Sequence, residues 1–356
     1  MFSFSLDSIS FYNLCALILG FLYGYISQQT QFCFSGSVKD IVLFKHTKRL
    51  ASIIMAMISA IFFTTLGSIV FNIDLTQTIY YTNANYLFII IGGLLFGYGM
   101  MLSDGCSSRH LIKFAQGDKY SLLSLISISI SAFIAYVLFD LFHDSIISNG
   151  FTILTNADNI FTIPAFGMIT ILIVILYFTL EKNFQNITST FDGFLIGILI
   201  AISWYVTTAL ANEHFIYIKD QSFSFIYPLQ KFSEYIGSFF TSSLFVYPVY
   251  LILGVLLGSF VSSKLNKKFK TTLSCHDSST KFQTIKEKII GGLCMGVGGY
   301  LTIGCTVGQG LSGVSTLACT SVLAIVSIMV SAYFTALHLK EKNRLIACFV
   351  FEFEKK

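Results

Sequence analysis

The sequence predicts an all-α integral membrane protein built from two related halves of opposite orientation. Only 11% of its 356 residues are charged and 54% are hydrophobic, whereas roughly 25% of the residues in soluble domains are charged. The mean hydropathy is +0.76, which excludes a soluble globule. A long motif also occurs twice in the chain, and an internal repeat constrains the fold before any other feature.

The repeated motif relates residues 92–109 to residues 291–308. Both copies begin Gly-Gly-Leu, continue with two more glycines at the same spacing and then reach a Gly-Cys pair. Five glycines and one cysteine coincide without a gap, the cysteines being Cys106 and Cys305. This agreement exceeds what composition explains.

Nine apolar segments reach the length of about 20 residues that a bilayer requires. They lie near 9–27, 50–71, 85–103, 121–142, 161–180, 191–211, 239–262, 288–303 and 314–339. No basic residue precedes the first segment, so we expect a retained helix rather than a cleaved signal. Residues 212–238 mix charges with aromatic side chains, which predicts a loop with an interfacial helix.

The distribution of positive charge predicts the topology. Twenty of the 22 Lys and Arg residues follow the first, third, fifth, seventh or ninth segment, and only Lys219 and Lys231 fall on the other side. Since positive loops stay in the cytoplasm, the N-terminus is expected outside and the C-terminus in the cytoplasm. The third segment then runs inward and the eighth runs outward, so the two motif copies have opposite orientations.

The halves are predicted to span residues 1–150 and 189–356, with a linking helix in 151–188. A fainter echo supports this division, because Gly20–Gly24 in the first half matches Gly193–Gly197 in the second. Inverted repeats are a recurrent transporter architecture, with the substrate site near the midplane between the halves.

Each Gly-Cys pair stands where an apolar helix ends and a glycine-rich polar stretch begins. Irregular backbone is tolerated at membrane depth only where it is buried in protein or lines a cavity, and helix N-termini there attract anions. We therefore predict that Cys106 and Cys305 line a narrow path. Cys33 has a similar helix-to-turn position, and Gln309 and Ser312 supply polar groups in the second turn.

Several nearby residues leave alternatives open. Arg109 either attracts anions or anchors a helix end on the positive side. Asp104 is costly near hydrocarbon, by about 2.5–3.5 kcal/mol, and is close enough in sequence to pair with Arg109. Cys294 has no cysteine counterpart in the first copy. Packing is the expected role of Cys15, Cys319, Cys348 and the paired glycines, and the six histidines, which lack repeat partners, are expected at interfaces.

No cofactor or metal site is predicted. The eight cysteines include no C-x-x-C motif and no Cys/His cluster of zinc spacing, so neither a metal framework nor a disulfide scaffold is indicated. A nucleotide-binding motif is also absent from the sequence, which excludes direct use of ATP.

These motifs resemble the YeeE/YedE family of bacterial sulfur-compound transporters, whose best-understood members import thiosulfate. The resemblance rests on F-C-F-S-G-x-x-x-D at Phe32–Asp40 and on the two glycine-rich motifs at Gly92–Arg109 and Gly291–Gly313. It implies an hourglass-like transporter of the inner membrane rather than an enzyme. Cysteine-bearing short helices would pass thiosulfate, or a similar sulfur anion, through transient S–H···S and S–H···O hydrogen bonds.

Carried over to this chain, the resemblance implies that Cys106 and Cys305 line the constrictions with Cys33 nearby. Thiosulfate importers of the family can use a further cysteine in the second half. None lies between Cys106 and Cys275, which leaves Cys294 to replace it. The resemblance also implies a separate TusA-like sulfur carrier in the cytoplasm, for which the basic 264–288 loop is either the docking site or an ordinary positive loop.

Three other functions stay open. A membrane thiol–disulfide oxidoreductase could use Cys33, Cys106 and Cys305, although inverted placement is expected to keep the last two beyond the Cα separation of about 7 Å that a disulfide permits. A passive channel for small solutes is the second alternative. The third is a selenium-compound transporter, because the family includes proteins linked to selenium metabolism.

Overall fold

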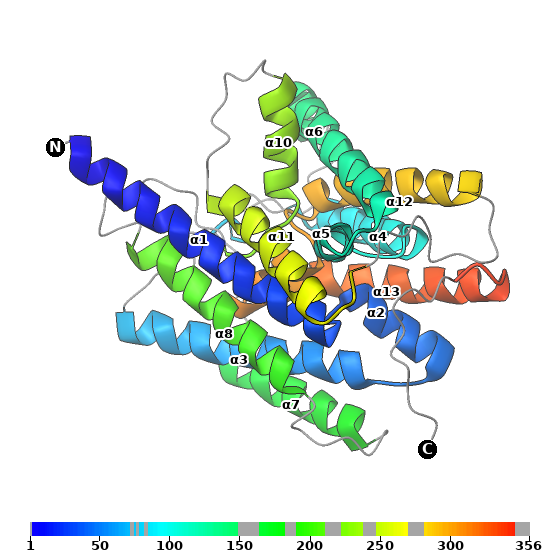
Figure 1. Cartoon of the computed structure of the whole chain (residues 1–356), viewed down its shortest axis with the longest axis horizontal. Coiled ribbons are helices and arrows are strands. Elements are labelled where there is room, and N and C mark those ends of the chain that lie inside the picture. The colour runs from blue at the N-terminus through cyan, green and yellow to red at the C-terminus, as the bar shows by residue number, and fades with distance from the viewer. Residues whose placement is uncertain are drawn as a thin grey trace.

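The computed structural model describes residues 2–71, 75, 78–81, 85–148, 164–181, 190–210, 222–237, 247–269 and 281–345. These residues form helices and turns without a β-strand, which confirms the predicted all-α class (Figure 1). The helices are α1 (Phe2–Thr30), α2 (Phe34–Lys39), α3 (Lys48–Phe71), α4 (Tyr86–Leu102), α5 (Ser107–Ala115), α6 (Lys119–Ser148), α7 (Ala165–Glu181), α8 (Phe191–Tyr205), α10 (Tyr227–Gly237), α11 (Tyr247–Leu265), α12 (Lys281–Leu301) and α13 (Cys319–Glu341). Three π-helical turns, Asp40–Phe44, Val206–Leu210 and Gly308–Gly313, complete them.

Each of the nine predicted apolar segments contributes to one of the described helices. Seven stretches are long and apolar enough to cross a membrane, namely Phe11–Phe44, Lys48–Phe71, Tyr86–Ala115, Lys119–Phe139, Phe191–Thr208, Tyr247–Leu265 and Cys319–Glu341. Helix α7 is a shorter apolar helix, and α12 carries lysines in its first turns. The protein is therefore a multi-pass membrane protein.

Glycine pairs allow four pairs of helices to pack closely. A Cβ atom at Gly20 or Gly24 of α1 would overlap the backbone of α11, and one at Gly193 or Gly197 of α8 would overlap α3. The same holds for Gly93 and Gly97 against α13, Gly254 and Gly258 against α1, and Gly292 and Gly296 against α6. The predicted packing role of these glycines is confirmed, since only a residue without a side chain fits such contacts.

Helices α4 and α12 cross in antiparallel fashion through four further glycines. A Cβ atom at Gly298 would lie 2.5 Å from the Gly92 carbonyl oxygen, and one at Gly291 would lie 2.7 Å from the Gly99 carbonyl oxygen. The early residues of each helix thus meet the late residues of the other. The end of each helix therefore lies beside the start of the other, with Ser103 next to Gly291 and Thr302 next to Gly92.

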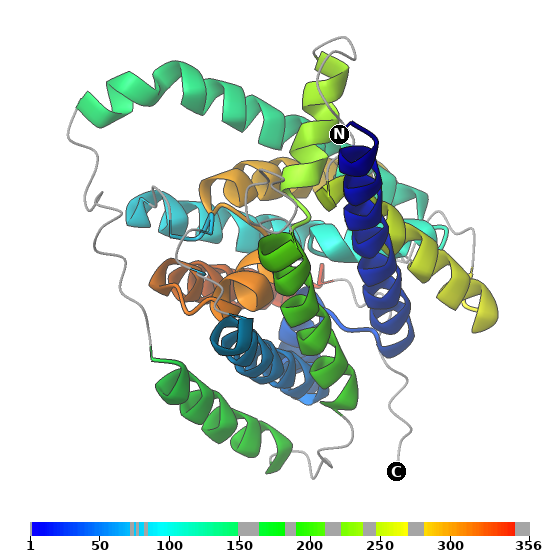
Figure 2. The same cartoon turned by 90° about the vertical axis from the view of Figure 1, so that its left-hand side faces the viewer.

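The remaining helices surround this crossing. In Figure 1, α6 and α10 lie above α4 and α12, whereas α3, α7 and α8 lie below them. Figure 2 shows α7 at the outer edge, and its packing partner is α3. Large apolar side chains of α7 are exposed, with Phe166 at 81% and Phe178 at 63%. In a chain of this composition such a surface fits contact with lipid.

Candidate functional site

The first motif copy breaks the chain between α4 and α5 in a defined turn. The Ser103 hydroxyl donates to the Gly99 carbonyl at 2.9 Å and to the Gly105 carbonyl at 3.2 Å. Asp104 then adopts the left-handed backbone conformation with φ of 62°, which few residues other than glycine adopt without cost. The turn is thus stabilised by a side chain that satisfies carbonyls at the helix end.

The second copy builds the same turn at the end of α12. The Thr302 hydroxyl donates to the Gly298 carbonyl at 2.9 Å and to the Gly304 carbonyl at 2.7 Å. Ile303 has φ of 59°, although a β-branched residue is a clear outlier in this region. The repeat seen in the sequence is therefore a repeat of backbone geometry as well.

Three buried thiols stand at the beginnings of the short helices that follow breaks in the chain. Cys33 caps α2, and its sulfur accepts a hydrogen bond from the Gly36 amide at 3.4 Å. Cys305 accepts one from the Gly308 amide at 3.4 Å, and Cys106 is the N-cap residue of α5. All three cysteines are free and buried.

These thiols come together, although they lie far apart in sequence. The Cys33 and Cys106 side chains are close enough to interact directly. The Thr306 hydroxyl, next to Cys305, lies beside Cys106. We call Cys33, Cys106 and Cys305 the thiol cluster.

Tyr23 of α1 links the two halves of the thiol cluster. It is 1% exposed and lies near both Cys106 and Cys305. Its ring contacts those of Phe223 and Phe225, with centroids 5.2 and 5.6 Å away. Tyr23 was not predicted from the sequence: it lies within the Gly20–Gly24 echo, but the echo does not show which side chains meet it. An aromatic wall of this kind excludes water from the thiols.

Hydroxyl groups accompany two of the thiols at the same spacing. The Ser35 oxygen lies 3.1 Å from the Cys33 sulfur, and the Ser108 oxygen lies 3.2 Å from the Cys106 sulfur. Each serine follows its cysteine by two residues, so the first turn of a short helix supplies both groups. Serine hydroxyls and thiols can each donate a hydrogen bond to an acceptor placed between them.

Two more hydroxyls have no hydrogen-bond partner of acceptable geometry. Ser107 follows Cys106, Thr306 follows Cys305, and both side chains are fully buried. They occupy equivalent positions in the two motif copies. Leaving a buried hydroxyl unpaired costs roughly 1–3 kcal/mol, so the Ser107 hydroxyl fits a donor to an external acceptor, whereas the Thr306 hydroxyl has the Cys106 sulfur beside it.

The second turn places Gln309 and Ser312 differently from each other. The Gln309 amide donates to the Thr302 carbonyl, while its Oε1 atom is buried without a partner. The Ser312 hydroxyl donates to the Phe223 carbonyl at 3.1 Å, which ties the aromatic segment to the turn. Gln309 thus retains one free acceptor, whereas Ser312 holds the structure around the thiols.

His110 is the counterpart of Gln309 in the first copy. Its Nε2 atom lies 3.2 Å from the Ser103 oxygen, and the side chain is fully buried. The expectation that the histidines lie at interfaces is wrong for this one. Counting back from Gln309 by the repeat would have identified it.

Arg109 and Cys33 share a cavity on one side of the thiol cluster. The Arg109 guanidinium donates to the Gln31 side-chain oxygen at 2.5 Å. Asp104 pairs with Lys39 and, at 2.6 Å, with Lys113. We call this space, whose volume is about 20 Å³, the Cys33 cavity.

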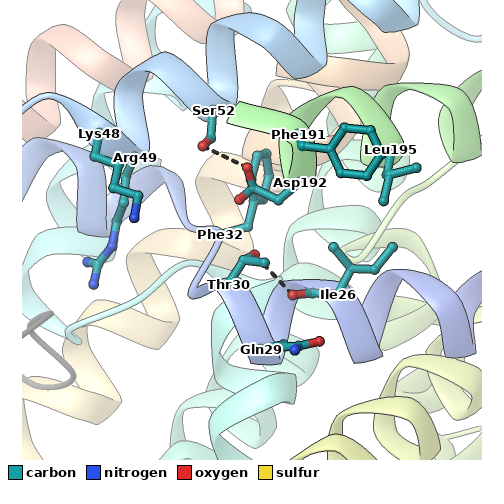
Figure 3. Close-up of a pocket in the computed structure, with 10 residues that line it drawn as sticks. All are labelled: Ile26, Gln29, Thr30, Phe32, Lys48, Arg49, Ser52, Phe191, Asp192 and Leu195. Carbon is teal, nitrogen blue, oxygen red and sulfur yellow. Dashed lines mark hydrogen bonds between the residues drawn. The ribbon is translucent and has the colours of Figure 1, made fainter. Parts of the chain in front are cut away.

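Two larger cavities lie nearby. The first, of about 350 Å³, is lined by Ser224, Gly304 and aromatic side chains, and we call it the Ser224 cavity. The second, of about 370 Å³, lies between α1, α3 and α8, where the Ser52 hydroxyl donates to Asp192 at 2.9 Å (Figure 3). Arg49 lines this second cavity and also the Cys33 cavity. The thiol cluster therefore has space close to it in more than one direction.

Cys294 lies away from the ends of the broken helices. It stands in α12 against Gly99, at the crossing with α4. Seven residues separate it from the end of α12 at Leu301, which corresponds to about 10 Å of helix. Its assignment to the substrate path stays a prediction.

Broken membrane helices whose ends lie inside the protein are a recurrent feature of small-solute transporters. When the sequence is compared with known families, residues 29–334 match the sulphur transport family. The chain belongs to this family, and the resemblance to YeeE/YedE proteins is confirmed.

Two relatives extend this result. The thiosulfate transporter TsuA of Escherichia coli (strain K12) is 21% identical over 324 residues, which cover 84% of this chain and 86% of the relative. The thiosulfate transporter TsuA of Spirochaeta thermophila (strain ATCC 700085 / DSM 6578 / Z-1203) is 24% identical over 332 residues, covering 86% and 93%. The similarity thus extends over nearly the whole length of each protein.

Proposed function

We propose that this protein takes up thiosulfate across the bacterial inner membrane and passes it through the thiol cluster. The observation that carries the proposal is the burial of Cys33, Cys106 and Cys305 at the starts of three short helices, with Cys33 beside Cys106 and with Thr306, the neighbour of Cys305, also beside Cys106. The family and the names of the two relatives support the substrate. The protein acts as a transporter and leaves the substrate chemically unchanged.

The chemistry of the site suits a soft sulfur anion. Thiols are weak donors and polarisable groups, so they can hold the terminal sulfur of thiosulfate without trapping it. The hydroxyls of Ser107 and Thr306 can donate to the oxygens at its other end. Passage requires binding that is favourable enough for entry and weak enough for exit, and neutral donors meet both conditions.

The proposal includes the predicted architecture. Residues 1–150 and 189–356 form two inverted halves joined through 151–188, with the N-terminus outside and the C-terminus in the cytoplasm. The antiparallel crossing of α4 and α12 supports this arrangement. A separate TusA-like carrier docks on the cytoplasmic side at the basic segment between α11 and α12. The loop predicted over 264–288 is shorter than expected, because α11 extends to Leu265 and α12 begins at Lys281, and residues 270–280 lie outside the described part of the chain.

Uptake measurements with matched cysteine variants test the proposal. Cells that lack other sulfate and thiosulfate importers would receive the wild type, Cys106→Ala, Cys305→Ala or the control Cys15→Ala, whose side chain is half-buried in α1. We expect uptake of radiolabelled thiosulfate by the wild type and the control, and loss of uptake in the other two at equal protein levels. Wild-type uptake by both Cys106→Ala and Cys305→Ala would refute the thiol path, and Cys294→Ala in the same assay decides whether that residue belongs to it.

One observation favours a second candidate, a thiol–disulfide oxidoreductase. Cys33 and Cys106 lie close enough to interact, so these two could form a disulfide on oxidation. Such an enzyme would need both residues but would tolerate Cys305→Ala. Absence of thiosulfate uptake by the wild type, together with a Cys33–Cys106 disulfide detected by mass spectrometry, would favour this alternative.

A further inference from the structure

Comparison of the two motif copies shows which charged residues the turn needs for its own structure. Both copies make the turn with the left-handed residue and the bridging hydroxyl described above. The first copy nevertheless carries Asp104 and Lys113 where the second carries Ile303 and Ser312. Because the uncharged copy folds into the same turn, the turn itself does not require these charges.

The charged residues form a compact buried group. The Asp104 carboxylate pairs with Lys39 on one side and with Lys113 on the other, and Lys113 also donates to the Asp104 carbonyl at 2.5 Å. Lys288 lies beside them and donates to the Ser103 carbonyl. All three lysine side chains are buried, with Lys39 at 6%, Lys113 at 2% and Lys288 at 5% exposure.

Burial distinguishes these lysines from ordinary positive anchors. Anchoring lysines extend their ammonium groups to the membrane surface, as the exposed Lys119 does at the start of α6. Burying an ion pair costs several kcal/mol of desolvation per ion, and a well-packed apolar group is often as stable. Ionisable residues retained inside a membrane protein therefore indicate a functional site by default.

The charged group lies directly beside the thiol cluster. Lys39, Asp104 and Lys113 line the Cys33 cavity together with Cys33 itself. The cavity measures about 20 Å³, which is room for about one water molecule. An anion that moved from the thiols into this space would have to replace a group already there. Two carboxylates line the cavity: Asp40 pairs with Arg49 at 3.4 Å, and Asp104 is the one that pairs with Lys39 and Lys113.

The other side of the thiol cluster differs in charge and size. The Ser224 cavity, of about 350 Å³, reaches Gly304 beside Cys305, and none of its described lining residues is charged. Ser224 stands between Phe223 and Phe225, as Cys33 stands between Phe32 and Phe34. Of these two cavities, only the Cys33 cavity has charged side chains among its described lining residues.

We propose that Lys39 and Lys113 form a second anion-binding site on the Cys33 side of the thiol cluster, where a divalent sulfur oxyanion replaces the Asp104 carboxylate between the two ammonium groups. This inference rests on the proposed function for the identity of the transported anion. Asp104 is the resident counter-ion: it pairs with the lysines while the site is empty and returns when the anion leaves. The lysines attract the anion out of the neutral thiol cluster, and competition from Asp104 prevents them from retaining it.

Sulfate is the appropriate probe, because it has the charge and shape of thiosulfate without the terminal sulfur that the thiols recognise. Isothermal titration of the purified full-length protein with sulfate, at constant ionic strength, would compare the wild type with three variants. Lys113→Ser introduces the residue that the second motif copy has at this position. Asp104→Asn removes the competing charge and keeps a residue that tolerates the left-handed conformation, and Lys119→Ser is the matched exposed control.

The lysine and aspartate variants are expected to change the affinity for sulfate in opposite directions. Sulfate binding should weaken about tenfold or more in Lys113→Ser, strengthen several-fold in Asp104→Asn and stay unchanged in Lys119→Ser. If Lys113→Ser fails to fold, Lys39→Gln replaces it with the same expectation. Weaker or unchanged binding in Asp104→Asn would overturn the proposal, as would unchanged binding in the lysine variant.

The same titration separates this site from the proposed function. Cys106→Ala should bind sulfate like the wild type, since Cys106 does not line the Cys33 cavity. A protein that shows the expected sulfate results but takes up no thiosulfate would refute the proposed substrate and leave the anion site standing. Cysteine-dependent uptake without the Asp104→Asn effect would refute only the site.

Discussion

Replacing a glycine by alanine at the crossing of α4 and α12 should create a steric clash. Its effect on stability can be compared with the same replacement at an uncrowded glycine of the same protein. In Gly298→Ala the new Cβ atom would lie 2.5 Å from the Gly92 carbonyl oxygen and 2.6 Å from the Phe96 amide nitrogen. Both neighbours are backbone atoms, so neither can rotate away. Gly67→Ala in α3 is the control, because a Cβ atom there meets no atom within 4 Å.

The magnitude follows from these distances. Relief to an ordinary contact of 3.4 Å requires the helices to separate by about 0.9 Å, and overpacking of this kind costs typically about 1–3 kcal/mol. Replacement of glycine by alanine inside a helix gains up to about 1 kcal/mol in either variant. The difference in unfolding free energy between Gly298→Ala and Gly67→Ala therefore isolates the clash, at about 1–3 kcal/mol.

Thermal unfolding of the purified protein in detergent measures this difference. We expect Gly67→Ala to melt at or slightly above the wild-type temperature and Gly298→Ala to melt several degrees below it. Thiosulfate uptake should fall in Gly298→Ala as well, because the displaced helix end carries Cys305. Equal melting temperatures for the two variants would refute the close crossing.

Two further predictions concern single side chains. Thr306→Val keeps the shape of the side chain and removes a buried hydroxyl that makes no hydrogen bond of acceptable geometry. The free energy of unfolding should therefore be unchanged or slightly higher, while the KM of thiosulfate uptake rises several-fold. A lower melting temperature with an unchanged KM would show that the hydroxyl has a structural role instead. Trp204→Phe loses the indole N–H that donates to the Ser312 carbonyl at 3.3 Å and to the Ser315 hydroxyl at 3.0 Å, which should lower the unfolding free energy by about 1 kcal/mol, and an unchanged melting temperature would contradict these hydrogen bonds.

Much of the fold could be predicted because membrane helices leave simple signals. Apolar length locates the spans, and a glycine every fourth residue marks close helix contacts. The repeat located the turns at Cys106 and Cys305 to the residue. Polar residue type placed Gln309 in the second turn, and its amide donates to Thr302 of that turn.

The buried charges and the aromatic wall could not be predicted in the same way. A lysine beside a span looks like a positive-inside anchor whether it is exposed like Lys119 or buried like Lys113. Its partner Asp104 lies nine residues earlier, in the turn before α5, and Lys39, which shares that carboxylate, comes from α2. Linear sequence does not show that these three side chains meet. Tyr23 was missed for the same reason, since its neighbours Phe223 and Cys106 lie far along the chain.

The separation of thiols from lysines has a physical reason. At 4 Å and an effective dielectric constant of 20, one fixed charge attracts a monovalent ion by about 4 kcal/mol, and a dianion about twice as strongly. An ammonium group in the middle of the thiol cluster would therefore hold thiosulfate for long periods. Neutral donors contribute only about 0.5–1.5 kcal/mol each, which allows the anion to move on.

Placement of the lysines on one side, already paired with Asp104, gives the anion a favourable next position without such retention. When the anion arrives, its gain is the difference between its own attraction to Lys39 and Lys113 and that of the carboxylate it replaces. This difference is smaller than the full attraction, so release requires only that Asp104 return to the lysines from which it was displaced. A protein that used the same turn twice could therefore make its two approaches unequal by changing a few side chains, and the charged first copy and the uncharged second copy differ in this way.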